Sequence, residues 1–220
     1  MSNYKTRTME KSLNSLIGKF PVIMITGPRQ VGKTTLLNHL TKSYKEKINY
    51  ISLDNLLARQ LAQEDPELFL RSHESPLIID EFQYAPNLLT YIKIKVDEAR
   101  KNAMFENQSE VGTLYYLTGF QIFETMNNVS ESLAGRIGIL DLYGFSTRVL
   151  NELQEDIFLP DINILKKKEK LNTISTKKVF ERIITGSYPE AINLDDTTRE
   201  KFYETYIRTY LERDVRQLIN

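Results

Sequence analysis

Cysteine is absent from this chain of 220 residues, and histidine occurs only twice, at His39 and His73. The lack of cysteine excludes disulfides, thiolate metal sites and cysteine nucleophiles. Neither histidine has a further ligand residue at metal-binding spacing, so we expect both to be structural or solvated. Thiol chemistry is therefore excluded, and a metal site built on histidine is not expected.

An excess of charge is also missing, because 29 Lys and Arg balance 29 Asp and Glu. The net charge of 0 gives no argument for nucleic acid or an acidic membrane as a partner, although a local basic face stays open. No apolar run has the length of a membrane span, and the polar N-terminus, MSNYKTRTMEK, lacks the apolar core of a signal peptide. We therefore expect a cytoplasmic protein with no membrane partner.

The composition itself is that of a globular protein, with 41% hydrophobic and 26% charged residues. The length allows one large or two small domains. Residues 151–175 are more polar, and the run KKKEK at 166–170 is typical of a solvated helix end or a linker. We predict a core domain over residues 1–150 and a helical region over residues 151–220, which acts as a lid or as a linker to a further C-terminal domain.

The stretch 27–34 reads GPRQVGKT and fits the phosphate-loop pattern G-x-x-x-x-G-K-[ST]. It follows an apolar run at 21–25 and precedes a helix-like run at 35–40, which is the context that the pattern needs. Its two glycines let the backbone approach a phosphate, and its N–H groups and the helix N-terminus attract an anion. Lys33 can reach the β- and γ-phosphates, and the Thr34 hydroxyl can bind Mg²⁺. We expect nucleotide binding by the loop and the next residue: Gly27, Pro28, Arg29, Gln30, Val31, Gly32, Lys33, Thr34 and Thr35.

A second motif, SPLIIDE at 75–81, is an apolar run that ends in two acids. Such a run is typical of a buried parallel strand, and ligands bind at the carboxyl ends of strands in open α/β sheets. Asp80 would hold Mg²⁺, directly or through water, and Glu81 would orient and deprotonate an attacking water. Taken alone, two acids after a strand also fit a solvated turn, and the phosphate loop upstream favours the catalytic interpretation.

The rest of the chain alternates strand and helix patterns. Strand patterns cover residues 21–25, 48–53, 76–79, 114–119 and 137–143. Helix patterns cover residues 3–19, 35–40, 55–72 with a break near Asp65-Pro66, 87–103, 120–134 and 176–220 with a turn at 186–189. This order predicts an α/β fold: a mostly parallel sheet with helices on both faces, followed by a small helical C-terminal region.

Together these motifs resemble the AAA-type ATPases of bacteria and archaea that carry a C-terminal domain of unknown function, a STAND-like group of P-loop ATPases. The resemblance spans nearly the whole chain. The combination is specific, although the pieces beyond the phosphate loop are individually weak. It rests on GPRQVGKTT at 27–35, LD at 53–54, DPE at 65–67, IIDEFQ at 78–83, LTG at 117–119, SLAGR at 132–136, GSYPE at 186–190 and YLERDV at 210–215.

The resemblance implies an additional-strand P-loop fold, in which an inserted strand separates the phosphate-loop strand from the Asp80 strand. It implies ATP rather than GTP, in keeping with the lack of an N-K-x-D motif. It also implies that Thr118 senses the γ-phosphate. Arg136 matches an arginine of the family and would stabilise charge on the transferring phosphoryl group, in cis or from a neighbouring subunit, unless it forms an ordinary surface ion pair.

The chain departs from this family in three places. Phe120 stands where a serine is usual, and Val149 where a glutamate is usual. The usual long C-terminal domain is missing, and the end at 217–220 has no capping glycine or polar tail, so we expect a truncated chain. A homo-oligomer or a protein partner would then act through the missing domain.

The function we expect is that of a Mg²⁺-dependent ATPase of regulatory or remodelling type. Three alternatives stay open. A nucleotide-dependent switch or scaffold would bind ATP or ADP and hydrolyse little. A small-molecule kinase would need a second substrate pocket, and a DNA-processing ATPase would respond to DNA. The residues assigned to hydrolysis are Lys33, Thr34, Asp80 and Glu81, assisted by Thr118 and Arg136.

Overall fold

The computed structural model describes residues 4–43, 47–107, 111–119, 132–153, 160–169 and 174–211. The chain divides into two compact units. One consists of Met9–Tyr143, and the other combines Met1–Thr8 with Gly144–Asn220.

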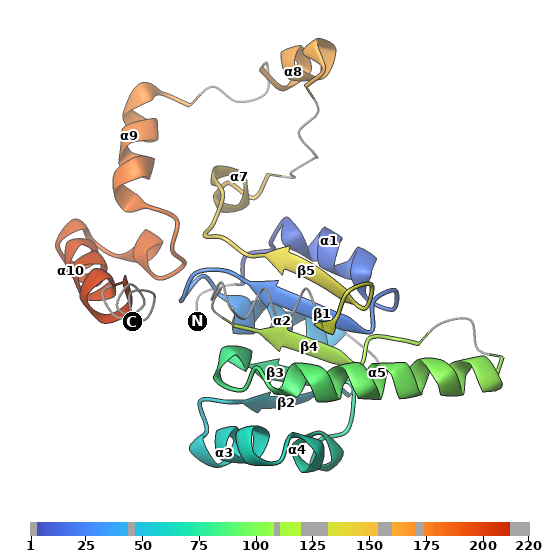
Figure 1. The fold of residues 1–220 in the computed structure, drawn as a ribbon. Helices are drawn as coiled ribbons and strands as arrows, with labels where there is room; N and C mark the ends of the chain where they lie inside the picture. Colours follow the sequence, from blue (N-terminus) through green and yellow to red (C-terminus); the bar gives the residue numbers. More distant parts are fainter. Residues whose placement is uncertain are drawn as a thin grey trace. The chain divides into compact units, whose positions relative to one another are not determined.

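The first unit is built on a five-stranded sheet (Figure 1). Its strand order is β2-β3-β4-β1-β5, and all four neighbouring pairs are parallel. Strand β4 therefore lies between β1 and β3, which confirms the additional-strand arrangement and the predicted α/β fold. The strands are β1 (Val22–Thr26), β2 (Asn49–Ser52), β3 (Leu77–Asp80), β4 (Tyr115–Thr118) and β5 (Ile137–Asp141).

The burial of each strand follows from its place in the sheet. The three inner strands β1, β3 and β4 are buried along their whole length. Their sequences are almost continuously apolar because helices cover both faces, as is usual for parallel sheets. The edge strands β2 and β5 include exposed residues. The polar exceptions on the inner strands, Thr26, Asp80 and Thr118, all stand at the carboxyl ends.

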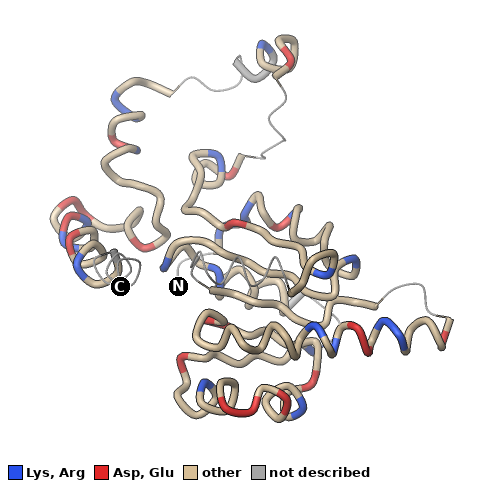
Figure 2. Tube along the Cα trace, viewed as in Figure 1, with Lys and Arg blue, Asp and Glu red and all other residues tan. Residues whose placement is uncertain are grey.

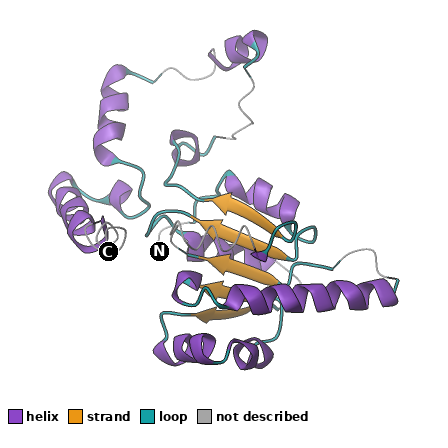
Figure 3. Ribbon diagram, viewed as in Figure 1, coloured by secondary structure: helices purple, strands orange, loops and turns teal. Residues whose placement is uncertain are grey.

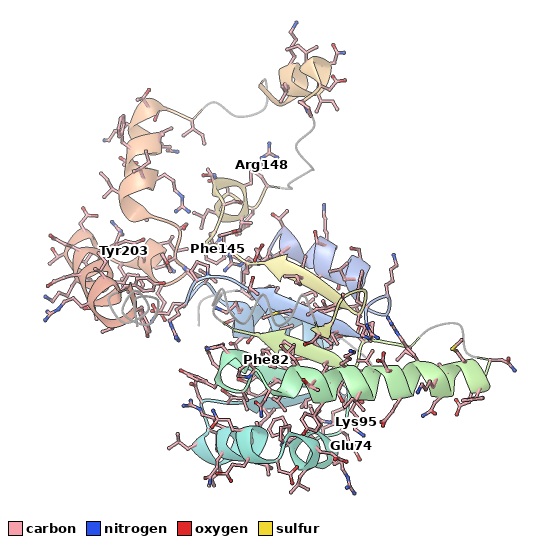
Figure 4. The ribbon with its side chains drawn as sticks, viewed as in Figure 1. Glu74, Phe82, Lys95, Phe145, Arg148 and Tyr203 are labelled. Carbon is pink, nitrogen blue, oxygen red and sulfur yellow. The ribbon has the colours of Figure 1, made fainter. Side chains whose placement is uncertain are left out.

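Helices flank this sheet on both faces (Figure 3). The main core packs the side chains of α3, α4 and α5 against alternate residues of β1, β3 and β4, and it includes the fully buried Phe82 (Figure 4). Helices α1 and α2 bury Leu13, Leu36 and Leu37 outside that cluster. The bounds are α1 (Met9–Leu16), α2 (Lys33–Ser43), α3 (Leu56–Glu64), α4 (Pro66–Ser72), the 3-10 turn η1 (Phe82–Tyr84) and α5 (Leu88–Phe105).

The local sequence explains where several of these helices begin. The Asn55 side chain accepts hydrogen bonds from the first N–H groups of α3. Asp65 does the same for α4, whose first residue is Pro66, so the predicted break is confirmed. Helix α1 is shorter than the predicted 3–19, since residues 4–7 have no regular structure. The predicted helix at 120–134 falls mostly outside the described residues.

The second unit is helical, as predicted for the C-terminal region. In it, the Arg7 guanidinium lies over the Phe145 ring at 3.9 Å, and Tyr188 packs against the aromatic rings of α10. Asp195 caps α10, and its side chain accepts a hydrogen bond from the Thr198 N–H. The elements are α7 (Thr147–Leu150), α8 (Ile162–Glu169), α9 (Thr176–Thr185), η2 (Ala191–Asn193), α10 (Asp196–Tyr206) and the π-helical turn η3 (Ile207–Leu211).

Candidate functional site

The phosphate loop connects the buried end of β1 to the first turn of α2. Gly27 has a φ of 139°, and a Cβ atom there would overlap the backbone carbonyl of Leu142. Gln30 and Gly32 also have positive φ values, 61° and 96°. Positive φ turns the backbone so that successive N–H groups can face one centre, and glycine adopts it at no steric cost. The loop therefore has the backbone form that an anion site requires.

Lys33 closes this loop on itself. Its ammonium group donates to the carbonyl oxygens of Gly27 at 2.9 Å and Pro28 at 2.8 Å. Only 7% of the residue is exposed. Burial lowers the pKa of Lys33, and the negative charges of Glu81 and Asp80 oppose that shift. The two direct partners of the ammonium group are neutral, so an anionic phosphate would be a stronger hydrogen-bond partner than either carbonyl.

The other predicted loop residues surround this lysine. Val31 is buried, Pro28 and Arg29 are half-buried, and Gln30 and Thr35 are exposed. The positive charge of Arg29 contributes to the lowered pKa of Lys33. The loop therefore offers two cationic side chains beside its N–H groups.

Asp80 is the centre of a hydrogen-bond network at the end of β3, and it is only 6% exposed. Its Oδ2 accepts from the Thr34 hydroxyl at 3.0 Å and from the Tyr50 phenol at 2.8 Å. Its Oδ1 accepts from the Thr118 hydroxyl and from the Glu81 backbone N–H. The structure thus brings together Thr34, Asp80 and Thr118, three residues that sequence reasoning assigned to one site. Their meeting depends on the insertion of β4 between β1 and β3.

Glu81 has a left-handed backbone, with φ 54° and ψ 43°. Its side-chain carboxylate accepts a hydrogen bond from the Gln83 amide. A Cβ atom at Gly119, the residue after β4, would overlap the Oε1 atom of Gln83. The glutamate is therefore held by a side chain whose terminal oxygen occupies the space beside Gly119.

Arg136 is not brought to this site within one chain. It directly precedes β5, and its carbonyl accepts from the N–H of Val22, the first residue of β1. The phosphate loop begins at the other end of β1, on the order of 16 Å away at about 3.3 Å per residue. The in-cis assignment for Arg136 is thus incompatible with this arrangement, because parallel strands put its position at the opposite edge of the sheet.

The Arg136 guanidinium makes a two-pronged ion pair with Asp97 of α5, through Nε at 2.8 Å and Nη2 at 3.0 Å. It also donates to the Ala134 carbonyl at 3.1 Å. The hydrogen bonds between the two side chains lower the pKa of Asp97 and raise the pKa of Arg136. This pair fixes the turn before β5 to helix α5.

Phe120, a departure from the family pattern, lies outside the described residues.

Two residues of the site were missed by sequence reasoning, Tyr50 and Gln83. Burial and the hydrogen bond to Asp80 raise the pKa of Tyr50, so its phenol is a donor at neutral pH. No sequence pattern marks Tyr50, because its nearness to Asp80 depends on the β2–β3 register, in which Ser52 pairs with Asp80. Gln83 is part of the IIDEFQ motif at 78–83, two residues after Glu81. The motif does not indicate that the Gln83 amide donates a hydrogen bond to Glu81.

The donor set fits a magnesium ion that also binds phosphate. Within the described ranges, no three His, Cys, Asp or Glu side chains gather as a metal cage. Mg²⁺ bound to nucleotides usually takes only one or two carboxylates and completes its shell with phosphates and water. The Thr34 hydroxyl and the Asp80 carboxylate, already in contact, supply that kind of set.

A phosphate loop after β1, an acid after β3 and an intervening parallel strand define the class of P-loop nucleotide-binding proteins. Within it, the chain belongs to the AAA domain family, whose model matches residues 19–151. The model of a domain of unknown function, DUF8612, matches residues 176–220. These matches confirm the resemblance to AAA-type ATPases with a C-terminal domain of unknown function.

Two curated relatives are uncharacterized proteins, Rv2008c of Mycobacterium tuberculosis and Mb2031c of Mycobacterium bovis. Each is 28% identical over 206 residues, which cover 94% of this chain and 38% of the relative. The chain therefore spans about two fifths of the length of these relatives.

Two solved structures are similar at low identity. The RuvB Holliday junction branch migration motor of Thermotoga maritima is 20% identical, with a TM-score of 0.43, over 67% of this chain and 48% of RuvB. The ORC2 protein of Aeropyrum pernix is 18% identical, with a TM-score of 0.41, over 78% of this chain and 54% of ORC2. Likeness at this level says nothing about the ligands or partners of the chain.

None of the described helices is both long and apolar enough to cross a membrane.

Proposed function

We propose that this chain binds ATP with Mg²⁺ at its phosphate loop and hydrolyses it. The observation that carries the proposal is the meeting of Lys33, Thr34, Asp80 and Thr118 at the carboxyl edge of the sheet, with Glu81 next to them. Membership of the AAA domain family supports the same conclusion.

Each residue would have one task. The loop N–H groups and Lys33 would hold the phosphates, and Thr34 and Asp80 would hold Mg²⁺. The bound ion would offset negative charge on the phosphate oxygens. Thr118 lies on the strand beside Asp80 and would contact the γ-phosphate when its hydroxyl leaves the carboxylate.

Hydrolysis would proceed by attack of water on the γ-phosphorus. A bond forms between the water oxygen and phosphorus, the bond to the bridging oxygen breaks, and ADP leaves with that electron pair. Glu81 would accept the proton that the attacking water loses. Because the Gln83 amide occupies the Glu81 carboxylate here, we infer that Glu81 changes partner before it acts.

Two substitutions test the proposal. Lys33→Ala should abolish measurable ATP binding, because the loop loses the charge that meets the phosphates. Glu81→Gln should bind ATP with unchanged affinity and hydrolyse it at least 100-fold more slowly, since general base catalysis contributes about 10²–10⁴. Binding is measured by calorimetry and hydrolysis by phosphate release. Normal turnover by Glu81→Gln would refute the assignment of the base.

A second candidate function is a nucleotide-dependent switch or scaffold with little turnover. The hydrogen bond from Gln83 to Glu81 favours it, because a glutamate with a bound donor is less available to a water molecule. Slow steady-state hydrolysis, together with nucleotide retained through purification, would identify this alternative. DNA as a partner stays a proposal. Basic and acidic residues follow one another along α5, so this helix has no continuous basic stripe (Figure 2).

A further inference from the structure

Tyr50 combines an exposed ring with a hydroxyl on the buried carboxylate of the site. The residue is 46% exposed, on the edge strand β2. It pairs in register with Ile78, two residues before Asp80 on β3, so Tyr50 and Asp80 share one face of the sheet. A diagonal neighbour at that separation is within reach of a long aromatic side chain. The phenol spans this diagonal and donates to Asp80 Oδ2 at 2.8 Å.

The hydrogen-bond capacity of Asp80 is full. A carboxylate accepts about four hydrogen bonds, two on each oxygen. Oδ2 accepts from Thr34 and Tyr50, while Oδ1 accepts from Thr118 and the Glu81 N–H. A cation that binds Asp80 must therefore replace one of these donors.

Thr34 is the donor that a cation would replace on Oδ2. Its own oxygen is a metal ligand in the proposed site, and its proton must turn away from the carboxylate when that oxygen binds the ion. The phenol approaches the same oxygen from the neighbouring strand and has no such conflict. If Tyr50 keeps its hydrogen bond, the lone pair of Oδ2 that becomes available is the one that faced Thr34. The phenol thereby determines the direction from which a cation can bind this oxygen.

We propose that Tyr50 is a positioning residue for the divalent cation, which keeps its hydrogen bond to Asp80 and aims the carboxylate at the ion held with Thr34. This inference rests on the proposed function. Hydrogen-bond donors to ligating carboxylates typically change metal affinity by about 10–100-fold when they are removed.

The test is Tyr50→Phe, which removes one oxygen atom and keeps the ring. Mn²⁺ serves as the probe, because its binding to the protein with ADP can be followed by electron paramagnetic resonance without turnover. We expect the dissociation constant of Mn²⁺ to rise about tenfold in Tyr50→Phe. The Mg²⁺ concentration that gives half-maximal hydrolysis should rise by a similar factor, because the loss lies in metal binding.

The matched control is Tyr115→Phe, which also removes one phenol oxygen from a strand of the same sheet. Tyr115 is buried at the start of β4, at the opposite edge from Asp80, so Mn²⁺ affinity should not change. The inference on Tyr50 is overturned if Tyr50→Phe binds Mn²⁺ as tightly as the wild type, or if Tyr115→Phe loses as much Mn²⁺ affinity as Tyr50→Phe. Either result leaves the proposed function intact. If the wild type binds no Mn²⁺ with ADP, the proposed function fails as well. Thermal unfolding of each variant confirms that it is folded.

Discussion

Backbone and side-chain groups of the protein hold the charged side chains of Lys33 and Glu81 before any ligand arrives. The Lys33 ammonium group is bound by carbonyl oxygens of the loop, and the Glu81 carboxylate is bound by the amide of Gln83. A Cβ atom at Gly119 would press on the end of the Gln83 side chain. The residue that binds the proposed base can thus influence how the base is oriented.

We predict that Gln83→Ala changes turnover rather than nucleotide affinity. Loss of the amide removes the donor that holds the Glu81 carboxylate, and the position of a catalytic group can change the rate by up to about 100-fold. We expect at least a tenfold change in kcat with an unchanged dissociation constant for ATP. A fall indicates that Gln83 orients the base, and a rise indicates that it restrains the base.

The control for Gln83→Ala is Gln60→Ala. Gln60 is exposed on α3 and contacts only Glu64 in the same helix among the hydrogen bonds described for it. Its substitution should leave kcat and affinity as they are. An unchanged kcat in Gln83→Ala would show that the hydrogen bond to Glu81 has no part in hydrolysis.

Residues of the candidate site could be predicted from the sequence where a motif specifies both the residue type and its spacing. Lys33, Thr34 and Asp80 were found in this way, and the structure gathers them. Tyr50 could not be found, because its role depends on the register between β2 and β3 and on which face of the sheet it shares with Asp80. Periodicity gives neither quantity.

The order of the strands determines which residues of the motifs can meet. Strand β4 lies against β3 and so places Thr118 beside Asp80, while β5 lies against β1 on the other side. The alternating pattern of the sequence predicted strands and helices, and only the family resemblance predicted their order. The placement of Arg136 follows from direction alone, since a residue before a parallel strand stands at the amino edge.

The Asp97–Arg136 pair joins α5 to the turn before β5 and makes stability depend on pH. The folded pKa of Asp97 is lowered, below an unfolded value of about 3.9. Its stabilisation is therefore present above pH 4 and is lost as pH falls through the folded pKa. Both side chains are partly exposed, so we expect Asp97→Asn to cost only about 0.5 kcal/mol at pH 7.

Urea unfolding of the wild type and of Asp97→Asn between pH 7 and pH 3 measures this effect. The difference in the free energy of unfolding should shrink as the carboxyl group is protonated. Arg136→Ala, combined with Asp97→Asn in a double-mutant cycle, isolates the pair from other effects. A difference that persists unchanged at pH 3 would contradict the assignment to this carboxylate.

At the scale of the whole molecule, the sheet unit and the helical unit differ in how well they bury apolar side chains. The sheet unit buries apolar side chains in its main core and also under α1 and α2. In the second unit, α9 has no buried residue, and Val179, Phe180, Ile183 and Ile184 are all exposed. The domain boundary at residue 150 stays a prediction. The division of the structure into two compact units falls between Tyr143 and Gly144.

Assembly would change the meaning of Arg136, because another copy could bring it to a phosphate site that its own chain cannot reach. The ion pair with Asp97 supports a structural role, so we predict that Arg136→Ala and Asp97→Asn hydrolyse ATP at equal rates per folded molecule, within about twofold. Phosphate release at several protein concentrations measures this.

An arginine that acts across subunits would give a different result. Its removal typically costs about 10³–10⁵ in rate. Arg136→Ala alone would then lose hydrolysis, and mixing it with Lys33→Ala would restore part of the rate. That outcome would overturn the structural role and would establish that the active form is an oligomer.

The contacts of Lys33 with Gly27 and Pro28 have a consequence for the exchange of ADP for ATP. On the proposed function, the buried ammonium group would return to two carbonyl oxygens of its own loop when a nucleotide leaves. The next nucleotide would meet a loop whose positive φ values at Gly27, Gln30 and Gly32 are already set, and it would replace two neutral acceptors with charged ones. Exchange would then need a change of hydrogen-bond partners at Lys33 and no refolding of the loop.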